Sequence, residues 1–92
     1  MKFPFSEPEN MAVITCCHII ENSADILYAS HDAEDGTWQF LCGGAHLQEQ
    51  ARVVSLKEVF TLDNTVSELA NIPSGYIAER KCKHSKWKIK KR

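Results

Sequence analysis

The chain has 92 residues, of which 43% are hydrophobic and 25% are charged, and its formal net charge at pH 7 is −1. This length and apolar content fit one domain with one modest core, and they exclude a two-domain protein and an intrinsically disordered chain. The longest apolar stretch, residues 11–20, is too short to span a membrane, and the first ten residues lack the pattern of a secretion signal. We therefore expect a soluble, cytoplasmic protein.

The charge is distributed unevenly along the chain. Residues 1–79 contain all twelve acidic side chains and three basic ones, a net charge of −9, whereas residues 80–92 contain eight basic side chains, a charge of +8. Such asymmetry indicates a contact with a nucleic acid or an acidic partner, or a tail that neutralises the domain's own acidic surface. We expect the last of these. The chain divides into a flexible N-terminal segment (1–10), one α+β domain (11–89) and a basic tail (90–92).

The first part of the domain has the composition of β-strands. Residues 12–20 are rich in β-branched side chains and are apolar on both faces, which predicts a central strand. A turn over residues 21–25 leads into a second predicted strand over residues 26–30.

A polar cluster then separates the second strand from the third. It ends in Asp35-Gly36, a dipeptide typical of hairpin turns, and residues 37–42 follow as the third strand. These three strands together predict an antiparallel meander. A short fourth strand is expected over residues 51–54.

The hydrophobic period changes at residue 55, which indicates helices. Ser55 with Glu58, and Thr65 with Glu68, each match the capping box that begins a helix, and apolar residues follow each pair at helical spacing. Two short, consecutive helices are therefore expected between residues 55 and 72.

The remaining residues predict a turn and two more strands. Residues 73–75 form a Pro-Ser-Gly turn, and strands are expected over residues 76–80 and 86–89. The predicted fold is α+β: an antiparallel sheet of about five strands with two short helices on one face, in the order β-β-β-β-α-α-β-β.

Several short patterns between residues 12 and 89 resemble a known group of proteins. They are Ser30-His31-Asp32, Asp35-Gly36, Trp38-Gln39-Phe40-Leu41-Cys42-Gly43, Val53-Val54-Ser55-Leu56, Asp63, Leu69-Ala70, Pro73-Ser74-Gly75 and Glu79-Arg80. This combination is similar to a family of small bacterial proteins of uncharacterised function and, more distantly, to immunity-protein-like domains of polymorphic toxin systems. The resemblance implies an α+β domain with a protein-binding role and no catalytic residues.

We therefore expect a non-enzymatic protein-interaction domain. Its expected partner is a toxin-like protein or a second copy of the chain, and no contact with a membrane is expected. The candidate binding residues are Asp32, Asp35, Trp38 and Trp87. Trp38 is interpreted either as a core residue or as an interface anchor, since tryptophan is enriched among binding hot spots. Lysines flank Trp87, so a strand there would turn Trp87 and Ile89 inward and the lysines outward.

The basic segment supports an alternative function, the binding of nucleic acid. Lysine and arginine neutralise phosphates, and an aromatic ring among them offers a stacking platform. The candidate residues are Arg80, Lys81, Lys83, Lys86, Lys88 and Lys90. The charge of −9 on the rest of the chain opposes this function, because it repels a polyanion.

The cysteines and histidines do not predict a metal site or a catalytic site. Because the protein is not expected to be secreted, we expect its cysteine thiols to be reduced and mostly buried; they belong to Cys16, Cys17, Cys42 and Cys82. Cys42 with His46, and Cys82 with His84, provide enough ligands for zinc, but their spacing is not that of a zinc knuckle. The acidic residues from Asp32 to Asp35 do not match a calcium loop. We expect no metal, no cofactor and no enzymatic activity.

Overall fold

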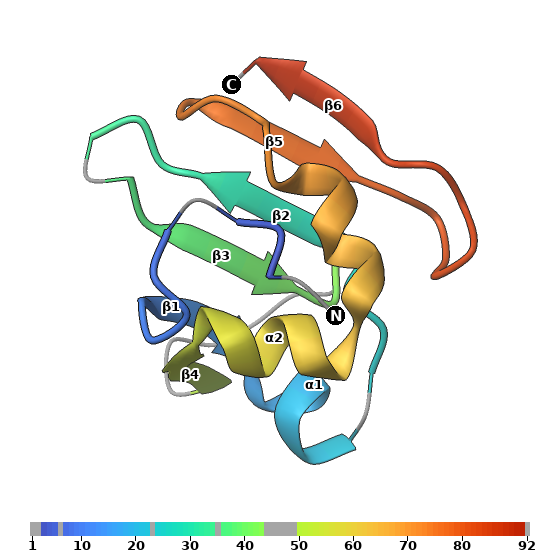
Figure 1. Ribbon diagram of the computed structural model, residues 1–92. Coiled ribbons are helices and arrows are strands. Elements are labelled where there is room, and N and C mark those ends of the chain that lie inside the picture. The colour runs from blue at the N-terminus through green and yellow to red at the C-terminus, as the bar shows by residue number, and fades with distance from the viewer. Residues whose placement is uncertain (1–2, 6, 23, 35, 44–49, 92) are drawn as a thin grey trace.

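The computed structural model describes residues 3–5, 7–22, 24–34, 36–43 and 50–91, and it confirms an α+β domain (Figure 1). Its elements are β1 (Ala12–Cys16), α1 (Cys17–Asn22), β2 (Tyr28–His31), β3 (Trp38–Leu41), β4 (Ala51–Ser55), α2 (Leu56–Leu62), the 3₁₀ helix η2 (Asn64–Leu69), β5 (Tyr76–Glu79) and β6 (Lys88–Lys91). Apart from α1, this is the order that the sequence predicts. Of the helices in the described residues, none has the length and apolar character needed to cross a membrane.

The strands form one sheet of six, in the spatial order β4-β1-β3-β2-β5-β6. All neighbours are antiparallel except β1 and β3, which are parallel. The predicted hairpin of the second and third strands is confirmed, but the meander of the first three strands is wrong, because β3 lies between β1 and β2. The sheet is therefore mixed, with one strand more than the expected five.

The change of topology begins at Cys17. The predicted strand over residues 12–20 divides into β1 and the helix α1, in which Ile19 is buried in the core. β-Branched residues favour strands only weakly, so tertiary packing can override that preference. After α1 the chain does not return next to β1. It enters β2 on the far side of β3, so β2 pairs with β3 and β5.

The helices α2 and η2 lie over one face of the sheet, and the core fills the space between them (Figure 1). The core residues are Phe5, Val13, Cys16, Ile19, Ile26, Ala29, Trp38, Phe40, Leu56, Val59, Val66, Leu69, Ile72 and Ala78. Phe5 belongs to the segment that the sequence analysis describes as flexible, and it packs edge-on against Trp38. Burial of these side chains supplies the main driving force of folding.

The first predicted helix start is confirmed and the second is wrong. The hydroxyl of Ser55 accepts a hydrogen bond of 3.1 Å from the backbone N–H of Glu58, so Ser55 caps α2. The cap of η2 is Asp63 and not Thr65, since Asp63 Oδ1 accepts from the backbone N–H of Thr65 at 3.0 Å. The Thr65 hydroxyl itself donates to Asp63 and accepts from Arg80.

The glycine turns have the geometry expected of them. Gly36 has a φ of +74° and lies in the loop between β2 and β3; its neighbour Asp35 is outside the described residues. Gly75 has a φ of +89°, and its N–H donates to the carbonyl of His31 at 2.6 Å. Both positions use the left-handed conformation that glycine adopts without strain.

Candidate functional site: an outer sheet face with a basic edge

The sheet face opposite α2 and η2 carries a row of side chains that crosses all six strands. In register, from β4 to β6, the row is Val53, Ile14, Gln39, Ser30, Ile77 and Lys90. Side chains alternate between faces along a strand, so this row lies opposite the core residues Val13, Ala29 and Ala78. Val53 is 71% exposed, and Lys90 is also exposed.

A second row on the same face runs beside the first. It consists of Leu41, Tyr28, Glu79 and Lys88, from β3 to β6. We call these two rows together the outer face. Its β4 side, with Val53 and Ile14, is apolar, its centre combines Leu41 and Tyr28 with the polar Gln39 and the buried Ser30, and its β6 side is charged. Part of the outer face, beside Tyr28, Gln39 and Leu41, is hollowed into a shallow pocket of about 300 Å³.

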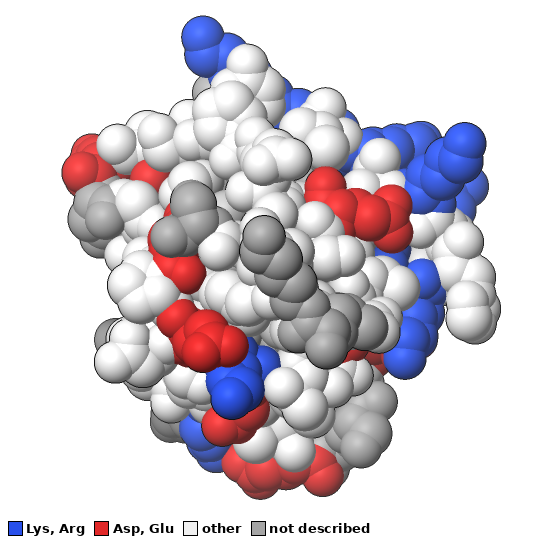
Figure 2. Space-filling model, in the orientation of Figure 1, with Lys and Arg blue, Asp and Glu red and all other residues white. Residues whose placement is uncertain are grey.

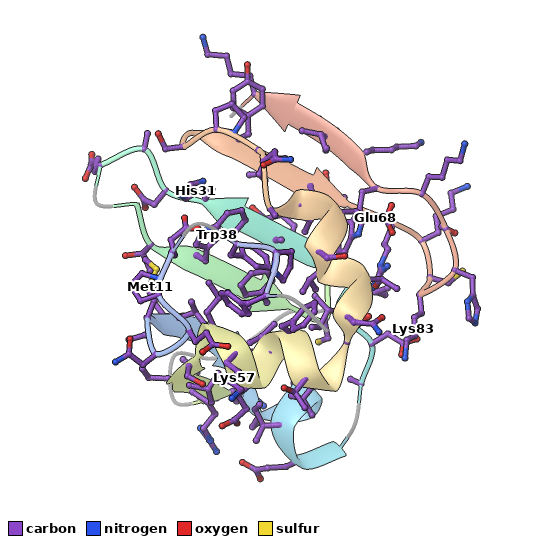
Figure 3. All side chains as sticks on the ribbon, viewed as in Figure 1. Met11, His31, Trp38, Lys57, Glu68 and Lys83 are labelled. Carbon is purple, nitrogen blue, oxygen red and sulfur yellow. The ribbon has the colours of Figure 1, made fainter. Side chains whose placement is uncertain are left out.

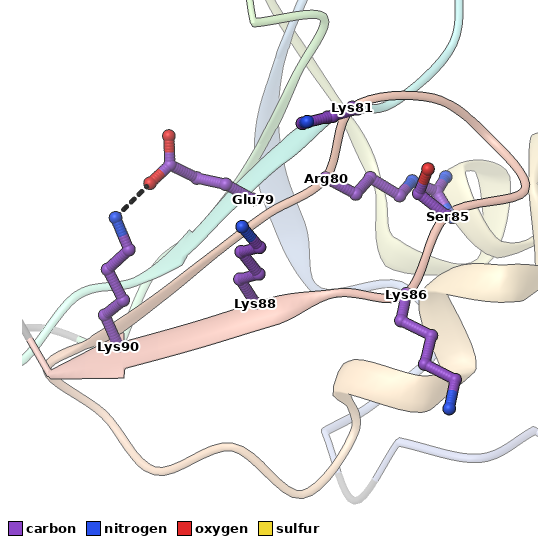
Figure 4. A pocket seen from close by; sticks show the side chains of 7 residues that line it. All are labelled: Glu79, Arg80, Lys81, Ser85, Lys86, Lys88 and Lys90. Carbon is purple, nitrogen blue, oxygen red and sulfur yellow. Dashed lines mark ion pairs between the residues drawn. The ribbon is translucent and has the colours of Figure 1, made fainter.

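The β6 side of the outer face borders a cationic groove of about 520 Å³ (Figure 4). The groove is lined by Glu79, Arg80, Lys81, Ser85, Lys86, Lys88 and Lys90. Figure 4 shows Lys88 and Lys90 projecting from β6 toward the side on which Glu79 lies, and Lys90 Nζ pairs with Glu79 Oε1 at 3.1 Å. We call the four exposed residues of β6 and the groove the basic edge.

The basic edge keeps most of its positive charge available to a partner. Within residues 80–91, which the structure describes, Arg80 and Lys90 form ion pairs, and the remaining lysines form none. In Figure 2 the lysine and arginine atoms gather mainly along one side of the molecule, while acidic atoms are spread over the face in view. The sequence predicts that the basic tail neutralises the domain's own acidic surface. Among the described residues, one exposed ion pair, Lys90 with Glu79, corresponds to that prediction.

Arg80 does not belong to the surface, and this corrects its assignment as a nucleic-acid contact. Its side chain is 1% exposed, and its guanidinium pairs with Asp63 at 2.9 Å. The same guanidinium donates to the carbonyls of Ile26 and Lys83 and to the Thr65 hydroxyl. A buried cation with all these partners holds the fold together and is unavailable to a phosphate.

Trp87 lies beneath this guanidinium. The Arg80 carbon Cζ is 4.1 Å from the centre of the Trp87 ring, so one face of the ring is already occupied. Trp87 packs against the core, as predicted, and its Nε1 is buried with no hydrogen-bond partner among the described residues. Ile89 pairs with the core residue Ala78 but remains 48% exposed, because β6 is the edge strand.

Trp38 is a core residue and not an interface anchor. It is fully buried, its ring stacks on His31 at 4.1 Å between centroids, and its Nε1 donates to Glu7 Oε2 at 2.9 Å. Figure 3 shows it over the face of the sheet that is in view, on which the helices also lie. The alternative interpretation in the sequence analysis, burial in the core, is confirmed.

The acidic turn beside Trp38 has a structural role. Asp32 Oδ1 accepts from the backbone N–H of Glu34 at 2.7 Å, and the Asp32 N–H donates to the carbonyl of Thr37 at 2.9 Å. These bonds close the hairpin loop between β2 and β3. Asp35, the other acidic candidate, lies outside the described residues.

The structure describes one of the two cysteine and histidine pairs of the sequence analysis. Cys82 and His84 are exposed in the loop before β6, and His46 lies outside the described residues. Cys42 faces His18, with 3.7 Å between Sγ and Nδ1. Sequence spacing missed this contact because 24 positions separate the two residues, and only the parallel pairing of β1 with β3 brings them together.

No protein-family model, curated protein or solved structure matches this chain. The resemblance to immunity-protein-like domains therefore stays a prediction, and we infer a function from the residues of the outer face and the basic edge.

Proposed function

We propose that this chain is a non-enzymatic protein-interaction domain that binds an acidic protein surface through its outer face and basic edge. The observation that carries the proposal is that Val53, an exposed apolar side chain, and Lys90, an exposed cation, lie in one row across the same face of the sheet. Protein interfaces likewise contain both apolar and charged side chains. An immunity-type role would be one case of such binding.

Charge complementarity supports an acidic partner. The lysines of the basic edge have few acidic neighbours, and steering by an opposite charge raises the rate of association. The fully extended pairing of a partner strand along β6 is disfavoured, because lysines on an edge strand oppose strand addition. The partner would therefore contact side chains of the outer face and would leave the backbone of β6 unpaired.

Nucleic acid is the second candidate, favoured by the same lysines. Single-strand binders combine such cations with exposed aromatic rings on which bases stack. Trp38 is buried and one face of Trp87 is covered by Arg80, so neither tryptophan offers an open platform. The apolar half of the outer face also has no function in phosphate binding. These two features favour a protein partner.

Affinity capture from a lysate of the source cells tests the proposal when it is run with matched charge variants. The test variant is Lys88→Glu combined with Lys90→Glu, which reverses the basic edge. The control is Lys57→Glu, an equally exposed lysine on α2, away from β6 (Figure 3). We expect wild type and control to retain one acidic protein, and the double variant to lose it. Capture should survive nuclease treatment and weaken at high salt.

The outcome that would overturn the proposal is also specific. Retention by the double variant at wild-type level would exclude the basic edge as the binding surface. Material that disappears on nuclease treatment, together with binding of a single-stranded RNA oligonucleotide tighter than about 10⁻⁶ M at physiological salt, would assign the surface to nucleic acid. A second variant, Ile77→Glu, tests the apolar side chains of the outer face. It should weaken capture although the lysines of the basic edge are unchanged.

A further inference from the structure

A cluster of three soft metal ligands lies at one end of the sheet, formed by Cys16, His18 and Cys42. One ligand atom from each residue lies within 4.8 Å of the other two, and Cys42 Sγ is 3.7 Å from His18 Nδ1. Neither the proposed function nor the sequence patterns discussed above use this cluster.

The distances are close to those that a tetrahedral metal requires. Zinc–sulfur bonds of about 2.3 Å and zinc–nitrogen bonds of about 2.0 Å place neighbouring sulfur and nitrogen ligands about 3.5 Å apart, and two sulfurs about 3.8 Å apart. The Cys42–His18 separation is therefore close to the bound value. The widest separation in the cluster, at most 4.8 Å, needs to shrink by about 1 Å, which a rotation about one side-chain bond supplies.

The backbone explains why the three ligands converge. Cys16 is the last residue of β1, and Cys42 follows the last residue of β3. The two strands are parallel and adjacent, so their carboxyl ends meet at the same end of the sheet. His18 lies in the first turn of α1, two residues beyond Cys16. In the antiparallel meander that the sequence predicts, β2 would separate the cysteines by about two strand spacings, or roughly 10 Å.

One ligand of the cluster is buried in the core, and the other two are partly exposed to solvent. Cys16 is 1% exposed within the core, whereas His18 and Cys42 are partly exposed, so a hydrated ion can reach the ligands. None of the four cysteines is in a disulfide, so the thiols of Cys16 and Cys42 are reduced. Two thiolates and one imidazole form the donor set that zinc and other thiophilic ions prefer, and carboxylate-seeking ions such as Mg²⁺ do not match it.

We propose that Cys16, His18 and Cys42 bind one Zn²⁺ ion as three of its four ligands. Binding displaces the protons of the two thiols, and His18 coordinates as neutral imidazole. The affinity for zinc consequently falls as the pH is lowered.

Titration of the reduced, metal-free protein with Co²⁺ and with Zn²⁺ tests the proposal. We expect one Co²⁺ per chain, with a thiolate-to-cobalt charge-transfer band whose intensity corresponds to two sulfur ligands, and displacement of Co²⁺ by an equimolar amount of Zn²⁺. His18→Ala and Cys42→Ser remove partly exposed ligands, so the fold should persist, which a circular dichroism spectrum checks. Each should weaken zinc binding by at least about 100-fold, more than the loss of a residue outside the ligand set.

Cys17→Ser is the matched control, because Cys17 lies between two of the ligands in sequence but is not in the cluster. It should bind as wild type does, and so should Cys82→Ser. The proposal is overturned if Cys17→Ser or Cys82→Ser loses the ion, if Cys42→Ser keeps the band of two thiolates, or if the wild type takes up no Co²⁺ at stoichiometric concentration. These results are independent of the basic edge, so they do not test the proposed protein partner.

Discussion

Arg80 and Asp63 form an ion pair inside the domain, with 2.9 Å between Nη2 and Oδ2 and side chains that are 1% and 6% exposed. Asp63 caps η2, and Arg80 directly follows β5. The guanidinium also donates to the carbonyl of Lys83 in the loop that leads to β6. This one pair therefore joins the helical layer, the sheet and the connection to the basic edge.

Arg80→Met should destabilise the domain by about 3 to 5 kcal/mol, because it leaves the Asp63 carboxylate buried without its cation. Urea unfolding followed by circular dichroism measures the loss. The control is Arg52→Met, which breaks a pair of similar length, 3.0 Å to Glu21, whose side chains are 40% and 55% exposed. Exposed pairs contribute about 0 to 1 kcal/mol. Similar losses for the two arginines would contradict the assigned role of Arg80.

Ser55→Ala should lower the free energy of unfolding by about 0.5 to 2 kcal/mol, since the N–H of Glu58 loses its acceptor at the start of α2. Ser55→Thr keeps a hydroxyl at the same position and should cost less. Thermal or urea denaturation of the two variants compares them directly. If alanine and threonine prove equally stable, the cap contributes nothing.

Trp38→Ala should cost about 3 to 5 kcal/mol, because it removes the largest side chain of the core. In a Trp87→Phe background, the fluorescence of Trp38 should be blue-shifted and poorly quenched by iodide. The reciprocal Trp38→Phe variant reports on Trp87, which is only partly buried. Strong quenching of Trp38 by iodide would show that the core is open at this position.

The thiol of Cys82 should react with iodoacetamide at lower pH than an ordinary cysteine. The hydroxyl of Ser85, 3.2 Å from Sγ, stabilises the thiolate and lowers the pKa of Cys82, and the backbone of His84 acts in the same direction. Ser85→Ala removes the first effect and should raise the pH midpoint of alkylation, measured by mass spectrometry of the Cys82 peptide. Ser67→Ala, at a serine remote from Cys82, should leave the midpoint unchanged. An unchanged midpoint in Ser85→Ala would exclude the hydroxyl as the cause.

The sequence predicts much of this fold, because most of its elements depend on local signals. The Ser55 cap, the Asp35-Gly36 turn and the alternation around Trp38 are each encoded within a few residues. What it misses depends on contacts between distant residues. The end of β1 at Cys16 and the parallel pairing with β3 are decided by packing across the sheet, which no local period records.

The candidate sites likewise have features that the sequence shows directly and features that depend on contacts between distant residues. The cluster of lysines in β6 is visible as a run of charge, and the structure adds the groove and the outer face beside it. Arg80 belongs to the same run of charge, but its burial depends on Asp63, 17 positions earlier in the chain. The three ligands of the proposed zinc site lie at the end of β1, in α1 and just after β3, so their convergence requires knowledge of the strand order.

The interior position of β1 has a consequence for how the chain folds. β1 lies between β3 and β4, and Ile14 pairs with Gln39 and Val53, which follow it by 25 and 39 positions. Contacts between such distant residues form slowly, since long loops must close first. The β2–β3 and β5–β6 hairpins can form from neighbouring residues, whereas β1 gains both partners only after residues 51–55 have been synthesised. We therefore expect the first strand of the chain to be among the last to reach its place in the sheet.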